Sequence, residues 1–227
     1  MITEHRSPNF DDRNRVPDLL LLHYTGMTSG TAALQRLCDP QAQVSSHYLV
    51  EEDGRVFALV DEEKRAWHAG RSRWTGEEGL NHGSIGIEIV NPGHEFGYRP
   101  FPEPQIAAVV ALSRDIVARW RIAPARVLGH SDVAPLRKED PGELFPWARL
   151  AGAGVGLWPL APAPAEADLA ASLQAFGYGY LDEDRPAVIR AFQRHFRPWR
   201  IDGKADAECR AIARWLADNV DRRDRRA

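Results

Sequence analysis

The chain has 227 residues, 44% of them hydrophobic, and a formal net charge of −3. This length suits one domain of about 150 residues with a smaller one beside it, and the composition supplies enough apolar side chains for a packed core. A charge so near zero indicates no nucleic acid or anionic membrane as a partner, and two cysteines are too few for a disulfide framework.

The N-terminal residues 1–14 are polar and charged and contain no apolar stretch of the kind that signal peptides carry. Apolar runs such as residues 19–22 are far too short to span a bilayer. We therefore predict a cytoplasmic protein with no transmembrane segment. A trimmed N-terminus would look the same, so a periplasmic or cell-envelope location is the alternative.

Strand and helix patterns alternate in the first half of the chain. Residues 19–24 form an apolar run that ends in polar residues, which predicts a strand buried on both faces. Residues 31–38 predict a short helix. Residues 46–50 and 55–60 predict a hairpin, because the Asp-Gly pair between them suits a tight turn.

The next elements complete a sheet with helices around it. Residues 84–90 alternate, so one face of this predicted strand carries Ile85, Ile87 and Ile89 and the other carries Gly86, Glu88 and Val90. Residues 104–121 predict the longest helix, and residues 127–129 a short strand that runs into His130. The predicted fold class is α/β, with a central mixed β-sheet flanked by helices.

A linker rich in Gly, Ala and Pro follows, reading AGAGVGLWPLAPAPA at residues 151–165. We place a first domain at residues 1–153, a linker at 154–165 and a small three-helix domain at 166–227. In the last of these, Asp184 is a predicted helix N-cap with proline in the first turn.

Three of the eight histidines stand at or near the ends of predicted strands, namely His23, His47 and His130. Side chains at strand ends can converge at one rim of a sheet, and a catalytic zinc takes three His or carboxylate ligands and leaves a fourth position open. His23, His130 and Asp140 could supply such a set. A single histidine is more often simply packed or exposed, so the residues alone leave both interpretations open.

Two charged residues accompany this candidate set. Glu88 interrupts a strongly β-prone run, so its carboxylate either faces solvent or points into a site. Lys138 lies two residues before Asp140, where a cation could stabilise an oxyanion, although a surface position is the ordinary explanation for a lysine.

Five blocks of the first domain resemble the zinc-dependent type-2 N-acetylmuramoyl-L-alanine amidases, which share the fold of peptidoglycan recognition proteins. The blocks are LLLLHYTGM at 19–27, VSSHYLVEEDG at 44–54, AWHAGRSRW at 66–74, NHGSIGIEIVNPG at 81–93 and LGHSDVAPLRKEDPGELFPW at 128–147. Each block alone is modestly specific, but together and in this order they are highly specific.

The resemblance implies one Zn2+ ion bound by His23, His130 and Asp140, with Glu88 as the catalytic carboxylate and Lys138 as the cation near the scissile carbonyl. Some relatives place a tyrosine just before the histidine of the second block. This chain has Ser46 there, so the acid–base role is expected to rest on Glu88.

The resemblance also implies a substrate-side loop. Its implied substrate-binding residues are Tyr24, His68, Arg71, Trp74 and Asn81. Arg71 could meet a stem-peptide carboxylate, or it could be a solvated surface side chain.

Residues 188–216, preceded by LQAFGYGY, resemble a three-helix peptidoglycan-binding domain that is often appended to cell-wall hydrolases. The implied substrate is peptidoglycan or a muropeptide, and no protein partner is implied. The main alternative is a peptidoglycan sensor without activity, but the complete ligand set argues against it. A more distant alternative is a hydrolase of another amide.

Overall fold

The computed structural model describes residues 2–160 and 166–220. Residue 1, the last five residues of the predicted linker and residues 221–227 lie outside these ranges. Within residues 2–160 and 166–220, no helix is long and apolar enough to cross a membrane.

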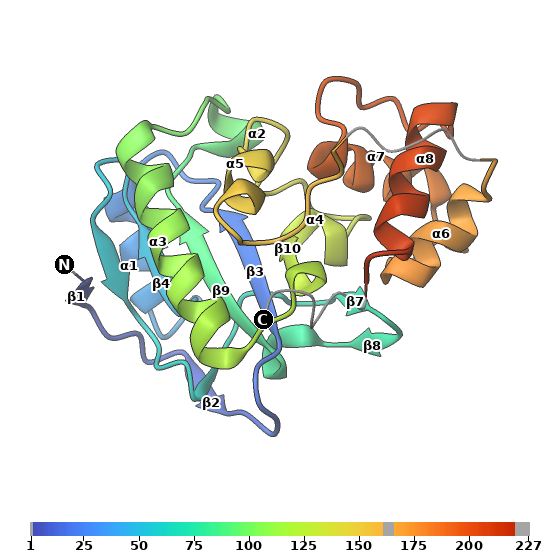
Figure 1. Cartoon of the computed structure of the whole chain (residues 1–227). Helices are drawn as coiled ribbons and strands as arrows, with labels where there is room; N and C mark the ends of the chain where they lie inside the picture. Colours follow the sequence, from blue (N-terminus) through green and yellow to red (C-terminus); the bar gives the residue numbers. More distant parts are fainter. Residues whose placement is uncertain (1, 161–165, 221–227) are drawn as a thin grey trace.

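A six-stranded mixed sheet forms the centre of the first unit, as Figure 1 shows. In spatial order the strands are β1 (Ile2–Glu4), β5 (Val56–Ala58), β4 (Tyr48–Val50), β9 (Ser84–Ile89), β3 (Leu19–Tyr24) and β10 (Val127–Gly129). The strands β4, β9, β3 and β10 are parallel, whereas β4 and β5 form the predicted antiparallel hairpin. The carboxyl ends of β3, β9 and β10 therefore share one edge of the sheet, and the predicted α/β fold is confirmed.

The long helix α3 (Glu103–Trp120) covers one face of this sheet (Figure 1). The core on this face contains Leu20 and Leu22 of β3, the three isoleucines of β9, and Ile106 and Val109 of α3. The predicted alternation along β9 is confirmed, because its isoleucines face α3. Glu88 and, one strand over, His23 are thereby left on the opposite face.

Shorter elements surround the sheet. Helix α1 (Gly30–Cys38) begins after Ser29, whose hydroxyl accepts from the Ala32 amide, as an N-cap does. The sequence patterns did not predict the remaining short elements, which are β2 (Phe10–Asp12), β6 (Lys64–Ala66), β7 (Arg73–Trp74), β8 (Glu77–Glu78), η1 (Leu80–His82), η2 (Pro124–Arg126), α2 (Gly93–Phe96), α4 (His130–Val133) and α5 (Trp147–Gly152).

Three helices form the second unit: α6 (Leu169–Phe176), α7 (Arg185–Phe196) and α8 (Ala207–Ala217). Each begins after an aspartate that caps it, and the prediction for Asp184 is confirmed. The unit packs directly on the first one. A single cluster of buried side chains joins them, including Leu19, Leu21, Trp74 and Val133 from the first unit and Phe176, Tyr178, Phe192 and Phe196 from the second.

Candidate metal centre

Three side chains converge at the carboxyl edge of the sheet. His23 is next to last in β3, His130 follows the end of β10, and Asp140 returns to the same point because its carbonyl accepts from the Ser131 amide at 2.9 Å. The Nδ1 atoms of His23 and His130 are 2.9 Å apart, and they lie 3.1 and 3.0 Å from Asp140 Oδ2. All three side chains are buried. The structure thus brings together the ligand set implied by the sequence.

The hydrogen bonds of His130 assign its tautomer. Its Nε2 lies 3.1 Å from the carbonyl oxygen of Ala69, which can only accept a hydrogen bond. Arg137 Nη2 lies 3.2 Å from the same nitrogen, but its two hydrogens go to the carbonyl oxygens of Ala69 and Arg71, at 2.5 and 2.8 Å. When His130 acts as a metal ligand, its ring proton therefore sits on Nε2 and its Nδ1 presents a lone pair.

A short chain of hydrogen bonds assigns His23 in the same way. The Ser84 hydroxyl donates to the Leu80 carbonyl at 2.8 Å, so it accepts from His68 Nε2 at 3.3 Å. His68 Nδ1 must then accept from His23 Nε2, at 3.1 Å. His23 Nδ1 is left with a lone pair that faces the one on His130.

This donor set fits a metal ion. Two imidazole lone pairs and a carboxylate oxygen meet with no proton between them, an arrangement that calls for a cation. Burial, together with the neighbouring His130, lowers the pKa of His23 to about 4, so its ring is neutral at pH 7. Although burial opposes it, proximity to His130 and His23 holds the pKa of Asp140 far below its usual value, so the carboxylate is charged. Two histidines and one aspartate match the three protein ligands that a catalytic zinc site uses.

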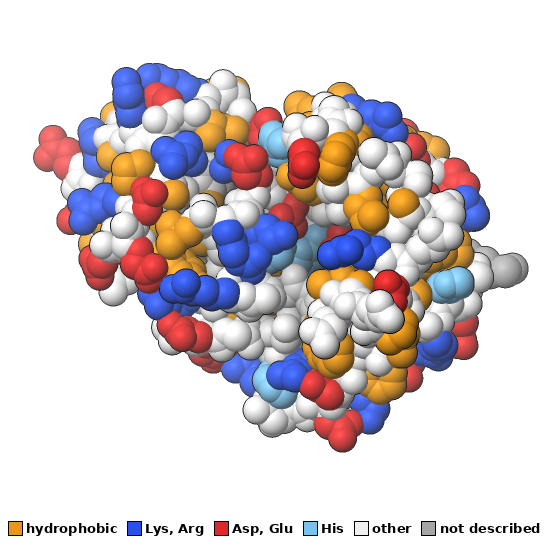
Figure 2. Space-filling model, turned by 180° about the vertical axis from the view of Figure 1, so that it is seen from behind, with side chains coloured by type: hydrophobic (Ala, Val, Ile, Leu, Met, Phe, Trp, Pro, Cys, Tyr) orange, Lys and Arg blue, Asp and Glu red, His pale blue; other side chains and the backbone are white. Residues whose placement is uncertain are grey.

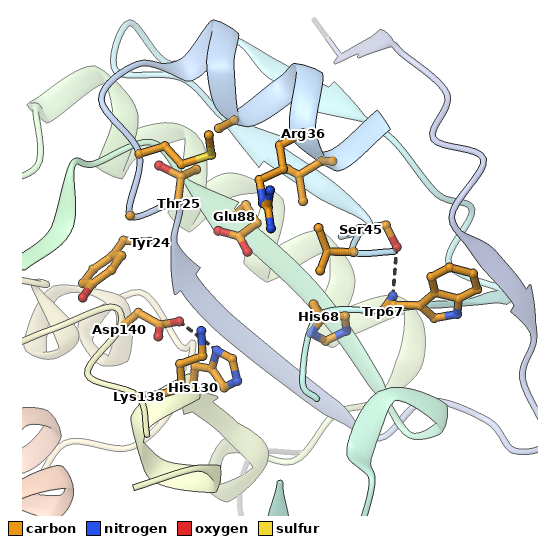
Figure 3. Close-up of a pocket in the computed structure, with 15 residues that line it drawn as sticks. Tyr24, Thr25, Arg36, Ser45, Trp67, His68, Glu88, His130, Lys138 and Asp140 are labelled. Carbon is orange, nitrogen blue, oxygen red and sulfur yellow. Dashed lines mark hydrogen bonds and ion pairs between the residues drawn. The ribbon is translucent and has the colours of Figure 1, made fainter. Parts of the chain in front are cut away.

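Glu88 faces the cavity beside these ligands, as Figure 3 shows. Its backbone is paired in register with His23 of the neighbouring strand. Its Oε2 is buried without a hydrogen-bond partner among the described residues, and burial raises the pKa of the carboxyl well above its ordinary value, with Asp140 adding to the effect and Lys138 opposing it. A carboxylate so placed is a suitable proton acceptor.

The cavity has a volume of about 280 Å³ and opens on the face shown in Figure 2, where a hollow has histidine in its depth and basic side chains on either side. Lys138, Tyr24 and His68 line it together with Glu88. Arg36 of α1 also lines this cavity (Figure 3), although the sequence did not identify it as a site residue. The spacing of α1 could have shown that Arg36 is exposed, but not that it faces this cavity.

The structure corrects the expectation of a substrate contact at Trp74. Its side chain is buried and packs edge-on against Phe176 and Tyr178 of the second unit, with ring centroids at 5.4 and 4.9 Å. A Cβ on Gly177 would lie 2.5 Å from the Trp74 ring. Trp74 is therefore part of the joint core, not of the cavity wall.

The remaining implied substrate residues have different positions. Arg71 has 79% of its side chain exposed and borders a separate hollow with Tyr180. Asn81 accepts hydrogen bonds from the amides of His68 and Ala69 at 3.1 and 2.7 Å. It therefore holds the segment that presents the His68 ring to His23 and the Ala69 carbonyl to His130. Neither residue lines the cavity that contains Glu88.

His47, the third histidine at a predicted strand end, is buried outside the ligand set. Its Nδ1 accepts from the Gly86 amide at 3.0 Å and its Nε2 lies 3.1 Å from the Lys64 carbonyl, while Arg13 stands 3.0 Å from the same nitrogen. Burial lowers the pKa of His47 to about 4 from 6.5. The ring is therefore neutral at pH 7.

We expect His47 to make stability depend on pH. Between pH 6.5 and 4 the unfolded chain binds a proton at this ring and the folded chain does not, so the free energy of unfolding falls as the pH drops, by roughly 3 kcal/mol at most. Urea unfolding of the metal-free protein at several pH values measures this slope. The variant His47→Gln should show a shallower slope, and an unchanged slope would contradict the prediction.

Comparisons with known proteins give the following matches. A protein-family model described as N-acetylmuramoyl-L-alanine amidase matches residues 13–143. The N-acetylmuramoyl-L-alanine amidase AmiD of Escherichia coli strain K12 is 41% identical over 229 residues, which cover 88% of this chain and 82% of AmiD. The structure of E. coli AmiD in complex with the substrate anhydro-N-acetylmuramic acid-L-Ala-D-γ-Glu-L-Lys has a TM-score of 0.80 at 40% identity and covers 90% of both chains. AmpDh3 from Pseudomonas aeruginosa has a TM-score of 0.82 at 35% identity, with 90% of this chain and 92% of AmpDh3 covered.

Proposed function

Because this chain belongs to the N-acetylmuramoyl-L-alanine amidase family, we propose that it hydrolyses the amide between N-acetylmuramic acid, or its anhydro form, and L-alanine, using one zinc ion held by His23, His130 and Asp140. The observation that carries the proposal is the convergence of these three ligand atoms beside the buried carboxyl of Glu88. A protein that binds peptidoglycan without cleaving it has no need of a metal site beside a buried carboxyl group.

Each residue of the site has a distinct task in this proposal. Zinc, when bound, supplies a Lewis acid at the scissile carbonyl. Glu88 takes a proton from the attacking water and passes it to the leaving alanine nitrogen, which its raised pKa favours. The ammonium group of Lys138, at the cavity wall, stabilises the negative charge that develops on the carbonyl oxygen.

Anhydro-muramyl peptides are the substrate class that we propose. The AmiD structure holds one such compound, and this chain matches AmiD over most of the length of both. The stem peptide in that compound contains D-γ-Glu, which leaves an α-carboxylate free. Arg36 at the cavity mouth is suited to meet a carboxylate of this kind.

We propose that the second unit also binds peptidoglycan, as its sequence resemblance implies. A hollow of about 200 Å³ lies among its helices and is lined mostly by apolar side chains, together with Asp168, Arg185 and Arg210. Such a hollow could hold part of a glycan or a stem peptide. Binding there would raise the effective concentration of substrate at the catalytic site.

The compartment stays a prediction. A cytoplasmic location would suit the turnover of muropeptides brought into the cell. A wall-binding second unit would suit an envelope location better. Cell fractionation distinguishes the two.

The proposal is tested by measuring the zinc content of the purified protein and the cleavage of anhydro-N-acetylmuramic acid-L-Ala-D-γ-Glu-L-Lys. We expect one zinc per chain and release of a peptide whose new N-terminus is L-alanine. A chelator should abolish the release, and added zinc should restore it. Binding of the compound without cleavage at any zinc concentration would favour the sensor function instead.

A further inference from the structure

Two neighbouring residues of α7, Arg194 and His195, contact the two chain segments that carry the proposed ligands His130 and Asp140. His195 Nδ1 lies 2.7 Å from Oδ2 of Asp132, which is two residues after His130. Arg194 forms an ion pair with Glu139, which directly precedes Asp140. In Figure 1 α7 lies beside α4, the short helix that begins at His130.

Asp132 is the centre of this contact and is fully buried. Its Oδ2 also accepts from the Gly129 amide at 2.8 Å, and its Oδ1 accepts from the Tyr178 hydroxyl at 2.6 Å. Two of its three hydrogen-bond donors therefore come from the second unit. A buried carboxylate needs such donors, because without them burial of its charge is strongly unfavourable.

The rings of this contact are tightly packed. His195 stacks between Trp147 and Phe196, with both centroid distances at 3.7 Å. Tyr178 pairs with Trp74 by a β-bridge and by ring packing. The position of Asp132 relative to the second unit is thus fixed by stiff groups.

We infer that the second unit positions the metal ligands, because Tyr178 and His195 hold Asp132, and Arg194 holds Glu139. A unit that served only to anchor the enzyme on its polymer would not need buried polar bonds to the helix of a ligand. The inference rests on the proposed zinc site. Tyr178, Arg194 and His195 are positioning residues, since none of them touches the ligand atoms.

The test compares two substitutions of His195 in the full chain. His195→Phe keeps a ring between Trp147 and Phe196 but removes the donor to Asp132. His195→Asn keeps an amide donor near the position of Nδ1 but removes the ring. Arg214→Ala, which breaks an exposed ion pair on α8, is the matched control.

The readouts are the dissociation constant for Zn2+, from competition with a colorimetric chelator, and the visible spectrum of the Co2+-substituted protein, which reports ligand geometry. Losing a direct hydrogen-bond partner of a ligand weakens metal binding by about 10–100-fold, and His195 acts on His130 one step further away, through Asp132. We therefore expect His195→Phe to bind zinc more weakly by no more than about tenfold and to alter the cobalt spectrum. His195→Asn should recover most of the affinity, and Arg214→Ala should match the wild type. Tyr178→Phe, which removes one hydroxyl, should weaken zinc binding in the same direction.

The outcomes separate the two levels of the proposal. If the wild type binds no zinc, the proposed function fails and this inference fails with it. If the wild type binds zinc and both His195→Phe and Tyr178→Phe bind it equally well with an unchanged cobalt spectrum, the positioning role alone is overturned. Thermal unfolding of each metal-free variant identifies any that do not fold, and Tyr178→Phe then provides the decisive comparison.

Discussion

Replacing Glu88 with glutamine is expected to lower kcat by roughly 10²–10⁴-fold while zinc stays bound, because the variant loses its general base but none of the three ligands. The amide of glutamine has nearly the shape of the carboxyl group but cannot accept the proton of the attacking water. The loss should fall on kcat more than on KM, since proton transfer belongs to the chemical step. Zinc content and steady-state cleavage of the anhydro-muramyl peptide measure both effects.

The same substitution should not destabilise the metal-free fold. Glu88 Oε2 is buried without a partner among the described residues, and burial already raises the pKa of this carboxyl. A neutral amide removes the cost of burying a charge there, so the free energy of unfolding should stay equal or rise. The control Glu63→Gln alters an exposed glutamate and should leave kcat unchanged. Full activity in Glu88→Gln would show that another group takes the proton.

The sequence predicts the central sheet well because its strands carry strong local patterns. The apolar run of β3 and the alternation in β9 each identify a strand, and the parallel arrangement puts their carboxyl ends together. His23 and Glu88 become neighbours for that reason. The two-residue strands β7 and β8 carry no such pattern, so they were not predictable.

The role of His68 could not be read from its own position. The sequence indicated a substrate-side loop, and the ring does line the cavity, but it also accepts a hydrogen bond from Nε2 of His23. A weak signal was present in Gly86. A Cβ at this glycine would lie 2.6 Å from the His68 ring, and a glycine inside a strand often marks a close approach by another group.

The joining of the two units was also outside the reach of sequence patterns. A linker rich in Gly, Ala and Pro suggested separate domains, yet α7 buries Gln193 and His195 as well as its apolar face. Burial on more than one side shows that this helix has several neighbours. The partner of His195 lies 63 residues away in the sequence, and no local pattern links such distant polar residues.

Replacing Asp140 with asparagine is expected to weaken zinc binding by more than about 100-fold, because even the loss of an outer partner of a metal ligand costs about 10–100-fold. Cleavage should fall to the background rate at limiting zinc. In the proposed site Asp140 supplies the anionic ligand, and its loss leaves only the imidazoles of His23 and His130 to hold a dication.

Thermal unfolding with and without zinc tests this prediction independently of activity. A ligand that binds only the folded state stabilises it by about 4 kcal/mol at 1,000 times its dissociation constant, so zinc should raise the Tm of the wild type and of the exposed control Asp182→Asn. Asp140→Asn should show almost no zinc-dependent rise. Asp140→Cys should recover much of it, because a thiolate is also a good zinc ligand. Equal zinc-dependent rises in Asp140→Asn and the wild type would exclude Asp140 as a ligand, whereas recovery by cysteine alone would show that this position needs an anionic donor to the metal.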